Sequence, residues 1–397
     1  MESLRRINLQ KNFSRLFWIQ ALLNVNIVNL VITLFYVQRG LSLSQIFYLS
    51  IVWAIINLLF ETPSSYMADL WGRKKTIIVG VVFSILSDIV MIFAHSFPLF
   101  VFSIALSAFS FACFTGTDEA IMYDTTRELG GENSSLHNLG KYFSARSLFK
   151  IGAPLVTAFI AQDLFDWQFV AVITLDIVAT VVALGFAFFL VEPHHYMDVE
   201  EQEAGVMRDA WQLIRSDWDM TRAMLGRTVI FIAAFVIWRF HQEFFVSNGI
   251  AVVVLGVAWC IHALAMYVFN QRITKFVGTM NVGRFINVLN ILATVSLGLM
   301  AVVVFTHSNI YAALVLFIVG AFFEQIRWTL YSEWYNKRSK SFNRATTLSL
   351  TNFIKSILDI PLLFIGSILV GLDMVYPFIF SFFLSLVAVV FFKIKNI

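Results

Sequence analysis

The chain has 397 residues, of which 59% are hydrophobic and 13% charged, and its mean hydropathy is +0.79. This apolar content exceeds the roughly half that is typical of soluble domains, so the composition predicts an integral membrane protein. A formal net charge of +3 is too small to indicate nucleic-acid binding. The two cysteines, Cys113 and Cys260, lie in separate apolar stretches, which argues against a disulfide framework.

Twelve segments are apolar and long enough to cross a bilayer, since a spanning helix needs about 20 mostly apolar residues. In chain order they are 16–37, 42–67, 76–94, 97–123, 141–161, 167–191, 224–246, 250–271, 284–305, 309–334, 345–370 and 374–392. We therefore expect an all-α integral membrane protein with twelve transmembrane helices. Six of them lie in residues 1–191 and six in residues 223–397, and this arrangement suggests a duplication.

Residues 192–222 form the long polar interval between these bundles, and we expect them to be a linker. Trp211 and Trp218 lie there among charges and aliphatic residues, which indicates a short helix at the membrane surface. His194 and His195 lack further ligands at suitable spacing, so they do not predict a metal site.

The distribution of Lys and Arg predicts how the chain is oriented in the membrane. Basic residues gather before the first span, in the interval 192–222, in the connections after even-numbered spans and at the C-terminal end, whereas the opposite connections contain only Arg39. Because Lys and Arg are retained on the cytoplasmic side, we expect both termini and the interval to be cytoplasmic, in the inner membrane.

A cluster of charges follows the second span, in the segment SSYMADLWGRKKTI at residues 64–77. Asp69 and Arg73, Lys74 and Lys75 lie there within seven residues. Anchoring beside anionic lipid explains the basic residues, but it does not explain the Asp, because acidic residues contribute little to orientation.

This segment resembles the signature that joins the second and third helices in the major facilitator superfamily. In that signature a small residue, an Asp four positions later and a Gly-Arg-Lys sequence follow the second span. Ser65, Asp69, Gly72, Arg73 and Lys74 occupy these places, with Ser65 standing where the family usually has Gly.

Residues 110–128, SFACFTGTDEAIMYDTTRE, are similar to the end of the fourth span in a bacterial, drug-efflux-like branch of the superfamily. The fifth span retains Gly152 and Pro154 of the family's antiporter signature but lacks its other glycines. The Arg that is common in the middle of the fourth span is absent from this sequence. These departures do not support a standard drug/proton antiport mechanism.

The resemblance implies a secondary transporter with two pseudo-symmetric bundles of six helices each, residues 1–191 and 223–397. The bundles would expose a central site alternately to either side of the membrane, with helices 1, 4, 7 and 10 lining the cavity. It also implies a charge network that latches the two halves, formed by Asp69, Arg73 and an acid at the cytoplasmic end of the fourth helix. Asp124 is well placed to be that acid, and a weaker copy would lie in the second half. The candidate gating residues are Asp69, Gly72, Arg73, Asp124, Arg284 and Glu333.

Ionisable residues inside the predicted spans are costly, and they indicate either structural ion pairs or a transport site. In the first half, Arg146 and Lys150 share a face of the fifth helix, at a depth similar to that of Asp118 and Glu119 in the fourth. An ion-pair cluster and a transport role are both open for these four residues.

In the second half, three helices each carry an acid and a base three or four positions apart. The pairs are Arg239 with Glu243, Glu324 with Arg327, and Lys355 with Asp359. Pairing within each helix could simply neutralise these charges. Because the tenth helix would face the cavity, we favour a functional role for Glu324 and Arg327.

Four polar residues in the other helices could serve either transport or structure. Asn26 and Asn29 share a face of the first helix and could bind solute or tie this helix to its neighbours. Asp88 and Asp176 lie near mid-depth in the third and sixth helices without an obvious base. Each is a proton carrier or, more simply, a neutral carboxyl that is hydrogen-bonded inside the bundle.

The sequence contains no nucleotide-binding loop, Cys-His cluster or nucleophile–base pattern, so we expect no cofactor, no metal and no enzymatic activity. A transporter of this kind must then use an ion gradient, and carboxylates that protonate on one side and release on the other can supply the coupling. Our hypothesis is proton-coupled export of an amphipathic organic compound, with Glu324 as the first candidate for the coupling carboxylate and Asp118 and Glu119 after it.

Three alternatives remain at this stage. The first is proton-coupled uptake or exchange of an anionic or zwitterionic metabolite, because the predicted cavity would contain several fixed positive charges. The second is translocation of a lipid headgroup, and the third is a membrane receptor or assembly factor that has the fold without transport. In each case the expected partners are a small molecule, protons and the lipid bilayer, with no nucleic acid, and we expect a monomer.

Overall fold

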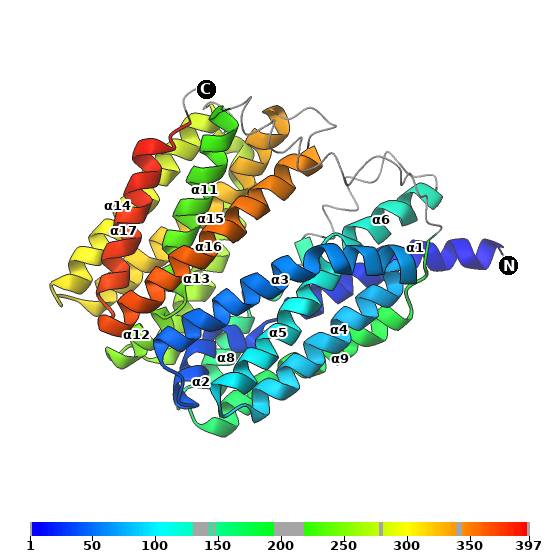
Figure 1. Cartoon of the computed structure of the whole chain (residues 1–397), viewed down its shortest axis with the longest axis horizontal. Coiled ribbons are helices and arrows are strands. Elements are labelled where there is room, and N and C mark those ends of the chain that lie inside the picture. Colours follow the sequence, from blue (N-terminus) through cyan, green and yellow to red (C-terminus); the bar gives the residue numbers. More distant parts are fainter. Residues whose placement is uncertain are drawn as a thin grey trace. The chain divides into compact units, whose positions relative to one another are not determined.

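The computed structural model describes residues 2–129, 142, 144–145, 148–193, 218–277, 281–338 and 344–394. Within these ranges every regular element is a helix (Figure 1), so the predicted all-α class is confirmed. The chain divides into two compact units, one formed by Met1–Leu41 and Leu49–Met197 and the other by Ser42–Tyr48 and Asp198–Ile397. Most of the expected linker lies outside the described residues, and its boundaries stay a prediction.

The first unit is built around a long helix that has neighbours on two sides. Its helices are α1 (Glu2–Leu23), the 3-10 helix η1 (Ile27–Leu30), α2 (Ile32–Gln38), α3 (Leu43–Trp71, of which residues 43–48 belong to the second unit), α4 (Arg73–Phe93), α5 (Phe97–Phe114), α6 (Thr117–Glu128), α8 (Ala153–Ile160) and α9 (Asp166–Phe188). Helix α4 packs along both α5 and α9, and α1 packs along α9. Leu16, Ile77, Ile121 and Ala187 join α1, α4, α6 and α9 in one buried apolar cluster.

The second unit contains the remaining helices. They are α11 (Trp218–Trp238), α12 (His241–Ser247), α13 (Val252–Val277), α14 (Val282–Phe305), α15 (Ile310–Arg338), α16 (Arg344–Leu372) and α17 (Tyr376–Phe391). Helix α14 packs along α15 and α17, and α11 packs along α16 and α17. A buried cluster that includes Met224, Ile286, Leu330 and Ile394 ties α11, α14 and α15 to the segment after α17.

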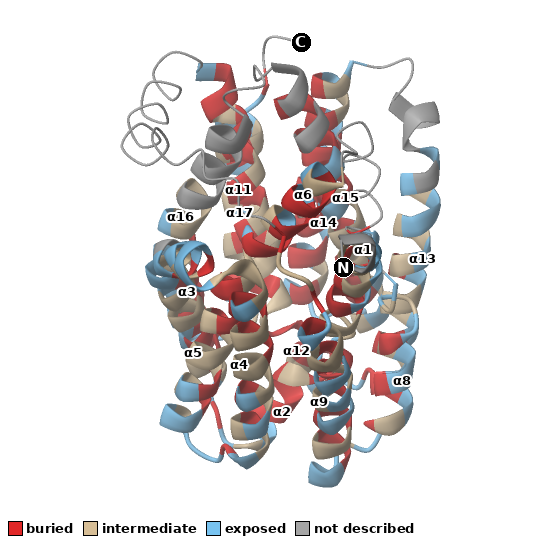
Figure 2. Ribbon diagram, turned by 90° about the vertical axis from the view of Figure 1, so that its right-hand side faces the viewer, coloured by how far each residue is buried: buried red, intermediate tan, exposed pale blue. Residues whose placement is uncertain are grey.

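The described helices have the lengths and surfaces of membrane spans. Nine are long and apolar enough to cross a membrane, and the bent pair Arg5–Leu30 with Ile32–Gln38 would be a tenth. Apolar side chains are exposed along their outer faces, as for Val253, Val257 and Ile261 on α13 (Figure 2). Repetition every four residues gives a helix one continuous apolar face, which suits contact with lipid tails. The chain is therefore a multi-pass membrane protein.

Two of the twelve predicted spans are not seen as full-length spans in the described residues. The fifth is represented by the eight residues of α8, because much of the segment before it lies outside the described part. The last is α17, which is apolar but only 16 residues long.

Three predicted spans are interrupted rather than continuous. The first changes direction by 51° after η1, the fourth breaks between α5 and α6 where Gly116 has a φ of 81°, and the seventh breaks between α11 and α12 at Phe240. Hydropathy averaged over a whole span does not locate these breaks, although polar residues such as Asn26, Asp118 and Arg239 lie beside them. Broken helices in transporters commonly lie beside binding sites, since they free backbone groups for other partners.

The contact between α4 and α5 depends on a glycine. A Cβ at Gly80 would lie 2.9 Å from Cε2 of Phe114 and 3.1 Å from Cβ of Cys113. The carbonyl of Gly80 also accepts a hydrogen bond of 2.7 Å from the hydroxyl of Ser110 on α5. The two backbones therefore approach too closely for any larger residue at this position.

We predict that Gly80→Ala lowers the stability of the purified protein by about 1–3 kcal/mol, because the added methyl overpacks this contact. Thermal unfolding in detergent should show a lower apparent Tm. Gly185→Ala on α9 is the matched control, since a Cβ there would meet no described atom within 4 Å. That variant should equal or slightly exceed the parent, because Ala favours helix over Gly. Equal Tm values for the two variants would contradict the packing argument.

Candidate functional site

The second unit contains a cavity of about 250 Å³ between α11, α13, α14 and α15. Its lining residues are Ile230, Phe231, Ala234, Phe235, Ile237, Trp238, Trp259, Ala293, Leu297, Phe317, Gly320, Ala321, Glu324 and Gln325. Among them only Glu324 and Gln325 contribute a carboxylate or amide group. A mostly apolar pocket with a few convergent polar groups is the usual form of a small-molecule site.

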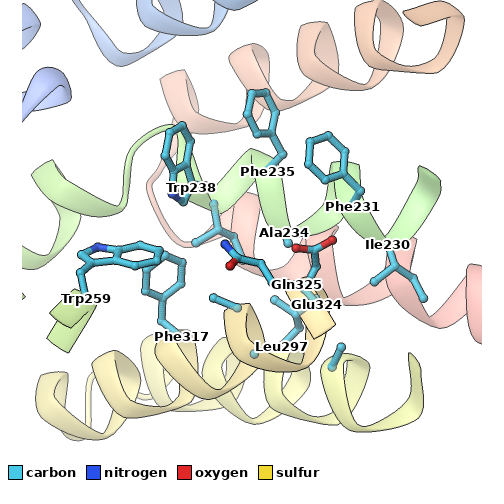
Figure 3. Close-up of a pocket in the computed structure, with 14 residues that line it drawn as sticks. Ile230, Phe231, Ala234, Phe235, Trp238, Trp259, Leu297, Phe317, Glu324 and Gln325 are labelled. Atoms are coloured by element: carbon cyan, nitrogen blue, oxygen red, sulfur yellow. The ribbon is translucent and has the colours of Figure 1, made fainter. Parts of the chain in front are cut away.

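Aromatic rings form the walls of this cavity. Phe231, Phe235 and Trp238 are four and three residues apart, so they share one face of α11, and their ring centroids are 5.4 Å and 5.8 Å apart. Trp259 and Phe317 meet edge to face at 5.8 Å. Figure 3 shows the amide of Gln325 between these two groups of rings and the carboxylate of Glu324 on the side of Phe231. The cavity therefore offers flat aromatic surfaces beside one carboxylate.

Glu324 and Arg327 form the ion pair that the sequence predicted on the tenth span. An Nη of Arg327 lies 3.1 Å from Oε1 of Glu324, and the indole N–H of Trp328 donates to the same oxygen at 3.0 Å. Glu324 is 7% exposed and Arg327 only 1%. Both charges are thus removed from water, and one carboxylate oxygen is engaged by two donors.

Arg327 is held on its other side by Asn290 of α14, which sequence reasoning missed. The second Nη of Arg327 donates to Oδ1 of Asn290 at 2.8 Å, and the amide of Asn290 donates to the hydroxyl of Tyr331 at 3.2 Å. Breaking a buried ion pair typically costs about 3–5 kcal/mol, because a charge is left uncompensated. The available signal was an Asn within an apolar span, where polar side chains commonly join helices.

Charged residues also lie between α11 and α16. Lys355 and Asp359 form the predicted ion pair within α16, and the Lys355 ammonium lies 5.0 Å from the ring centre of Phe231. The guanidinium of Arg239 lies over the ring of Phe235 at 4.5 Å and interacts electrostatically with Asp359.

The expectation that Arg239 and Glu243 lie four apart on one helix was wrong in its geometry. Helix α11 ends at Trp238 and α12 begins at His241, so the two residues are on opposite sides of a break. The same correction applies to Asn26 and Asn29. Helix α1 ends at Leu23, and Asn26 has a left-handed φ of 48° just before η1, so these two side chains do not share one face of a continuous helix.

In the first unit, the motif after the second span forms a charge network at the start of α4. Arg73 makes an ion pair with Asp124 of α6, and these side chains are 13% and 8% exposed. The chain reverses at Gly72, whose φ of 96° disfavours any other residue. Asp69 is exposed in the last turns of α3.

Glu192 completes this network, although sequence reasoning assigned it to the linker. Its two carboxylate oxygens accept hydrogen bonds of 2.8 Å from the backbone N–H groups of Arg73 and Lys74. A carboxylate at this place satisfies the free N–H groups that begin α4 and complements the positive end of its dipole. The signal in the sequence was an acid immediately after the sixth span.

The remaining candidates are placed as follows. Asp118 is buried and accepts a hydrogen bond from the hydroxyl of Tyr142, whereas Glu119 and Lys150 are exposed. Arg146 and the side chain of Glu333 lie outside the described residues. Arg284 is exposed near the start of α14, and the proposed copy of the network in the second half stays a prediction.

We predict that Glu192→Gln lowers the stability of the protein by about 1–2 kcal/mol, because the Gln amide group would face a backbone N–H that needs an acceptor. Glu128→Gln is the matched control. It removes a half-exposed ion pair with Arg5 and should cost less than about 1 kcal/mol. The measurement is thermal unfolding of both variants in the same detergent. A smaller loss for Glu192→Gln than for Glu128→Gln would contradict the capping role.

The chain was compared with known families, curated proteins and solved structures. The family model described as Major Facilitator Superfamily matches residues 18–360. No curated protein sequence matches the chain.

Several solved transporters share the fold at low sequence identity. A mutant of the nucleoside transporter NupG aligns with a TM-score of 0.77 and 12% identity, over 97% of this chain and 98% of that one. A bacterial homolog of the human lysosomal transporter Spinster, in an inward-facing and occupied conformation, aligns with a TM-score of 0.70 and 14% identity, over 98% and 96%. A D-xylose-proton symporter aligns with a TM-score of 0.70 and 12% identity, over 98% and 96%.

These likenesses to solved structures concern the fold. The match to the family model covers most of the chain and includes the loop signature and the interrupted apolar helices. The chain belongs to the Major Facilitator Superfamily and has the fold of its secondary transporters.

Proposed function

We propose that this transporter exports an amphipathic organic compound in exchange for protons, and that the cavity of the second unit is its binding site. The observation that carries the proposal is the combination of an aromatic wall with the buried carboxylate of Glu324. Ring faces attract flat apolar groups and, through their quadrupole, cations. A compound with a flat apolar body and a positive or hydrogen-bond-donating group fits these surfaces.

The basic residues near the cavity are already paired, which favours a cationic or hydrogen-bond-donating substrate over an anionic one. Arg327 is 1% exposed and is bonded to Glu324 and Asn290, and Lys355 is paired with Asp359. An anionic substrate would have to displace these partners, which would leave buried charges and polar groups unpaired. Glu324, by contrast, lines the cavity itself.

Competition at Glu324 supplies a simple coupling scheme. Ionised Glu324 attracts a positive or donating substrate group, whereas protonated Glu324 has lost that charge. A proton and a substrate that exclude each other at one carboxylate cross the membrane in opposite directions, so an inward proton gradient drives export. The proposal includes the orientation and the branch of the family. Both termini would lie in the cytoplasm, the protein would lie in the inner membrane, and it would belong to the drug-efflux-like branch.

Uptake or exchange of an anionic or zwitterionic metabolite, or of a lipid headgroup, is the alternative. One structural neighbour is a D-xylose-proton symporter, and symport would bring substrate and proton in together. Thermal-shift measurements separate these cases, because a ligand that binds only the folded protein raises its Tm. Stabilisation by ethidium and tetraphenylphosphonium supports export. Stabilisation only by nucleosides, dicarboxylates or glycerophosphodiesters would replace it with the alternative.

We predict that Glu324→Gln abolishes ethidium accumulation driven by a pH gradient in inverted vesicles, since Gln neither binds nor releases a proton. Exchange of labelled ethidium at equal pH should continue, because this step needs no net proton movement. Asp373→Asn, in an exposed loop, is the control and should behave as the parent. Intact pH-driven accumulation in Glu324→Gln would remove this residue from the coupling role.

We infer that the ion pair of Arg73 and Asp124 is part of a gate, together with Asp69. An ion pair that forms in one conformation stabilises that conformation, so its removal shifts the balance between states. We predict that Asp124→Asn slows ethidium transport by about tenfold, which corresponds to about 1.4 kcal/mol in the barrier. The Kd for ethidium should change by less than about twofold. Glu128→Gln is the control, and a selective loss of binding in Asp124→Asn would contradict the gate.

A further inference from the structure

Side chains from two other helices form hydrogen bonds with the backbone at the break in the first membrane span. Helix α1 ends at Leu23, and η1 begins at Ile27 after Asn26, whose φ of 48° and ψ of 51° are left-handed. The backbone N–H of Ile27 donates to Oδ1 of Asp176 on α9 at 2.8 Å, and the N–H of Val28 donates to Oδ2 at 2.9 Å. The hydroxyl of Thr157 on α8 donates to the carbonyl of Ile27.

These hydrogen bonds matter because the groups they satisfy are buried inside a membrane protein. Ile27, Val28 and Thr157 are buried, and Asp176 is 9% exposed. No water is available within a bilayer to replace a lost partner of a backbone group. An ionised carboxylate accepts on both oxygens, whereas a protonated carboxyl turns one oxygen into a donor. The strength of the hydrogen bonds at the break therefore depends on whether Asp176 carries a proton.

A second carboxyl lies within electrostatic range of the first. Helix α4 packs along α9, and Asp88 of α4 interacts electrostatically with Asp176. Two carboxylates that interact in a medium of low dielectric constant repel each other, so ionisation of one disfavours ionisation of the other.

Among the residues that the structure describes, the helices packed around this pair place no compensating cation beside it. Arg73, Lys74 and Lys75 begin α4, and Lys75 is 13 positions from Asp88, or about 20 Å along the helix. The basic residues of α1 end at Arg15, while η1 and α8 contain no charged residue. The remaining titratable groups of these described helices are Tyr36 of α2, which donates to Met91, and Cys113 of α5. Helix α6 adds its acids, Tyr123 and, in its last turn, Arg127. Asp166 pairs with Arg39 at the start of α9.

We propose that Asp88 and Asp176 form a proton-binding site in the first unit. Ionised Asp176 stabilises the break in the first span by accepting hydrogen bonds from the backbone of Ile27 and Val28, and protonation of Asp176 weakens these hydrogen bonds. Asp88 is the alternative position of the proton, so the pair carries one negative charge while the break is held. This site is separate from Glu324 and from the aromatic cavity. It gives helix 1 a proton-dependent movement whatever compound the protein carries.

The test is hydrogen–deuterium exchange of the whole protein in nanodiscs, followed in peptides that cover residues 24–31 between pH 5 and 8.5. Protection factors are corrected for the intrinsic pH dependence of amide exchange. In the parent protein, protection should fall by about tenfold or more as the pH falls, because protonation removes the charged acceptor. Constant protection across this range would overturn the proposal.

Three variants assign the effect to the pair. Asp176→Asn should show low protection without pH dependence, because Asn has one acceptor oxygen and cannot titrate. Thr157→Val is the matched control: it removes the other hydrogen bond at the same break and should lower protection at every pH while retaining the pH dependence. Asp88→Asn should lose protection at the same or a lower pH than the parent, since a neutral side chain at this position never repels the charge of Asp176.

Two results in the variants would also overturn the proposal. One is pH dependence that persists unchanged in Asp176→Asn, because the titrating group would then lie elsewhere. The other is loss of protection at a higher pH in Asp88→Asn than in the parent. If Asp176→Asn does not fold, the comparison of Thr157→Val with Asp88→Asn still decides between a titrating pair and a passive cap.

Discussion

Within a bilayer, each charge and each free backbone group must find its partner inside the protein, and much of this structure follows from that constraint. The break in helix 1 is possible because Asp176 and Thr157 supply partners for the backbone of Ile27 and Val28. Arg327 is tolerated at 1% exposure because Glu324 and Asn290 both bond to it. At these two places, buried polar groups therefore occur together rather than singly.

The same constraint separates structural charges from residues that are available for transport. Arg327 and Lys355 are each paired with a carboxylate, so these two cations contribute little free positive charge to the cavity. Glu324 differs because it both joins the network and lines the cavity. A change in its protonation would alter the partners of Arg327 and the surface offered to a substrate at once. This dual position makes Glu324 the strongest coupling candidate in the second unit.

Sequence reasoning reached the all-α membrane fold, the family and the contacts between residues that are close along one helix, such as Glu324 with Arg327 and Lys355 with Asp359. It also reached the pair of Arg73 and Asp124, through the family signature. It missed Asn290, Glu192 and Asp176 as partners, because each contacts a residue more than 30 positions away. It also took the first and seventh spans as continuous, and this produced the wrong geometry for Asn26 and Asn29 and for Arg239 and Glu243.

The sequence by itself determined that this chain enters a membrane as a series of apolar helices and belongs to a transporter family, because hydropathy and a local charged signature are properties of neighbouring residues. The tertiary structure alone decided where those helices break and which polar groups meet. A break is stable only when side chains from other helices satisfy the freed backbone groups, and no local pattern around residues 24–31 contains Asp176 or Thr157. For the same reason, the aromatic cavity around Glu324 exists only once four helices are packed together.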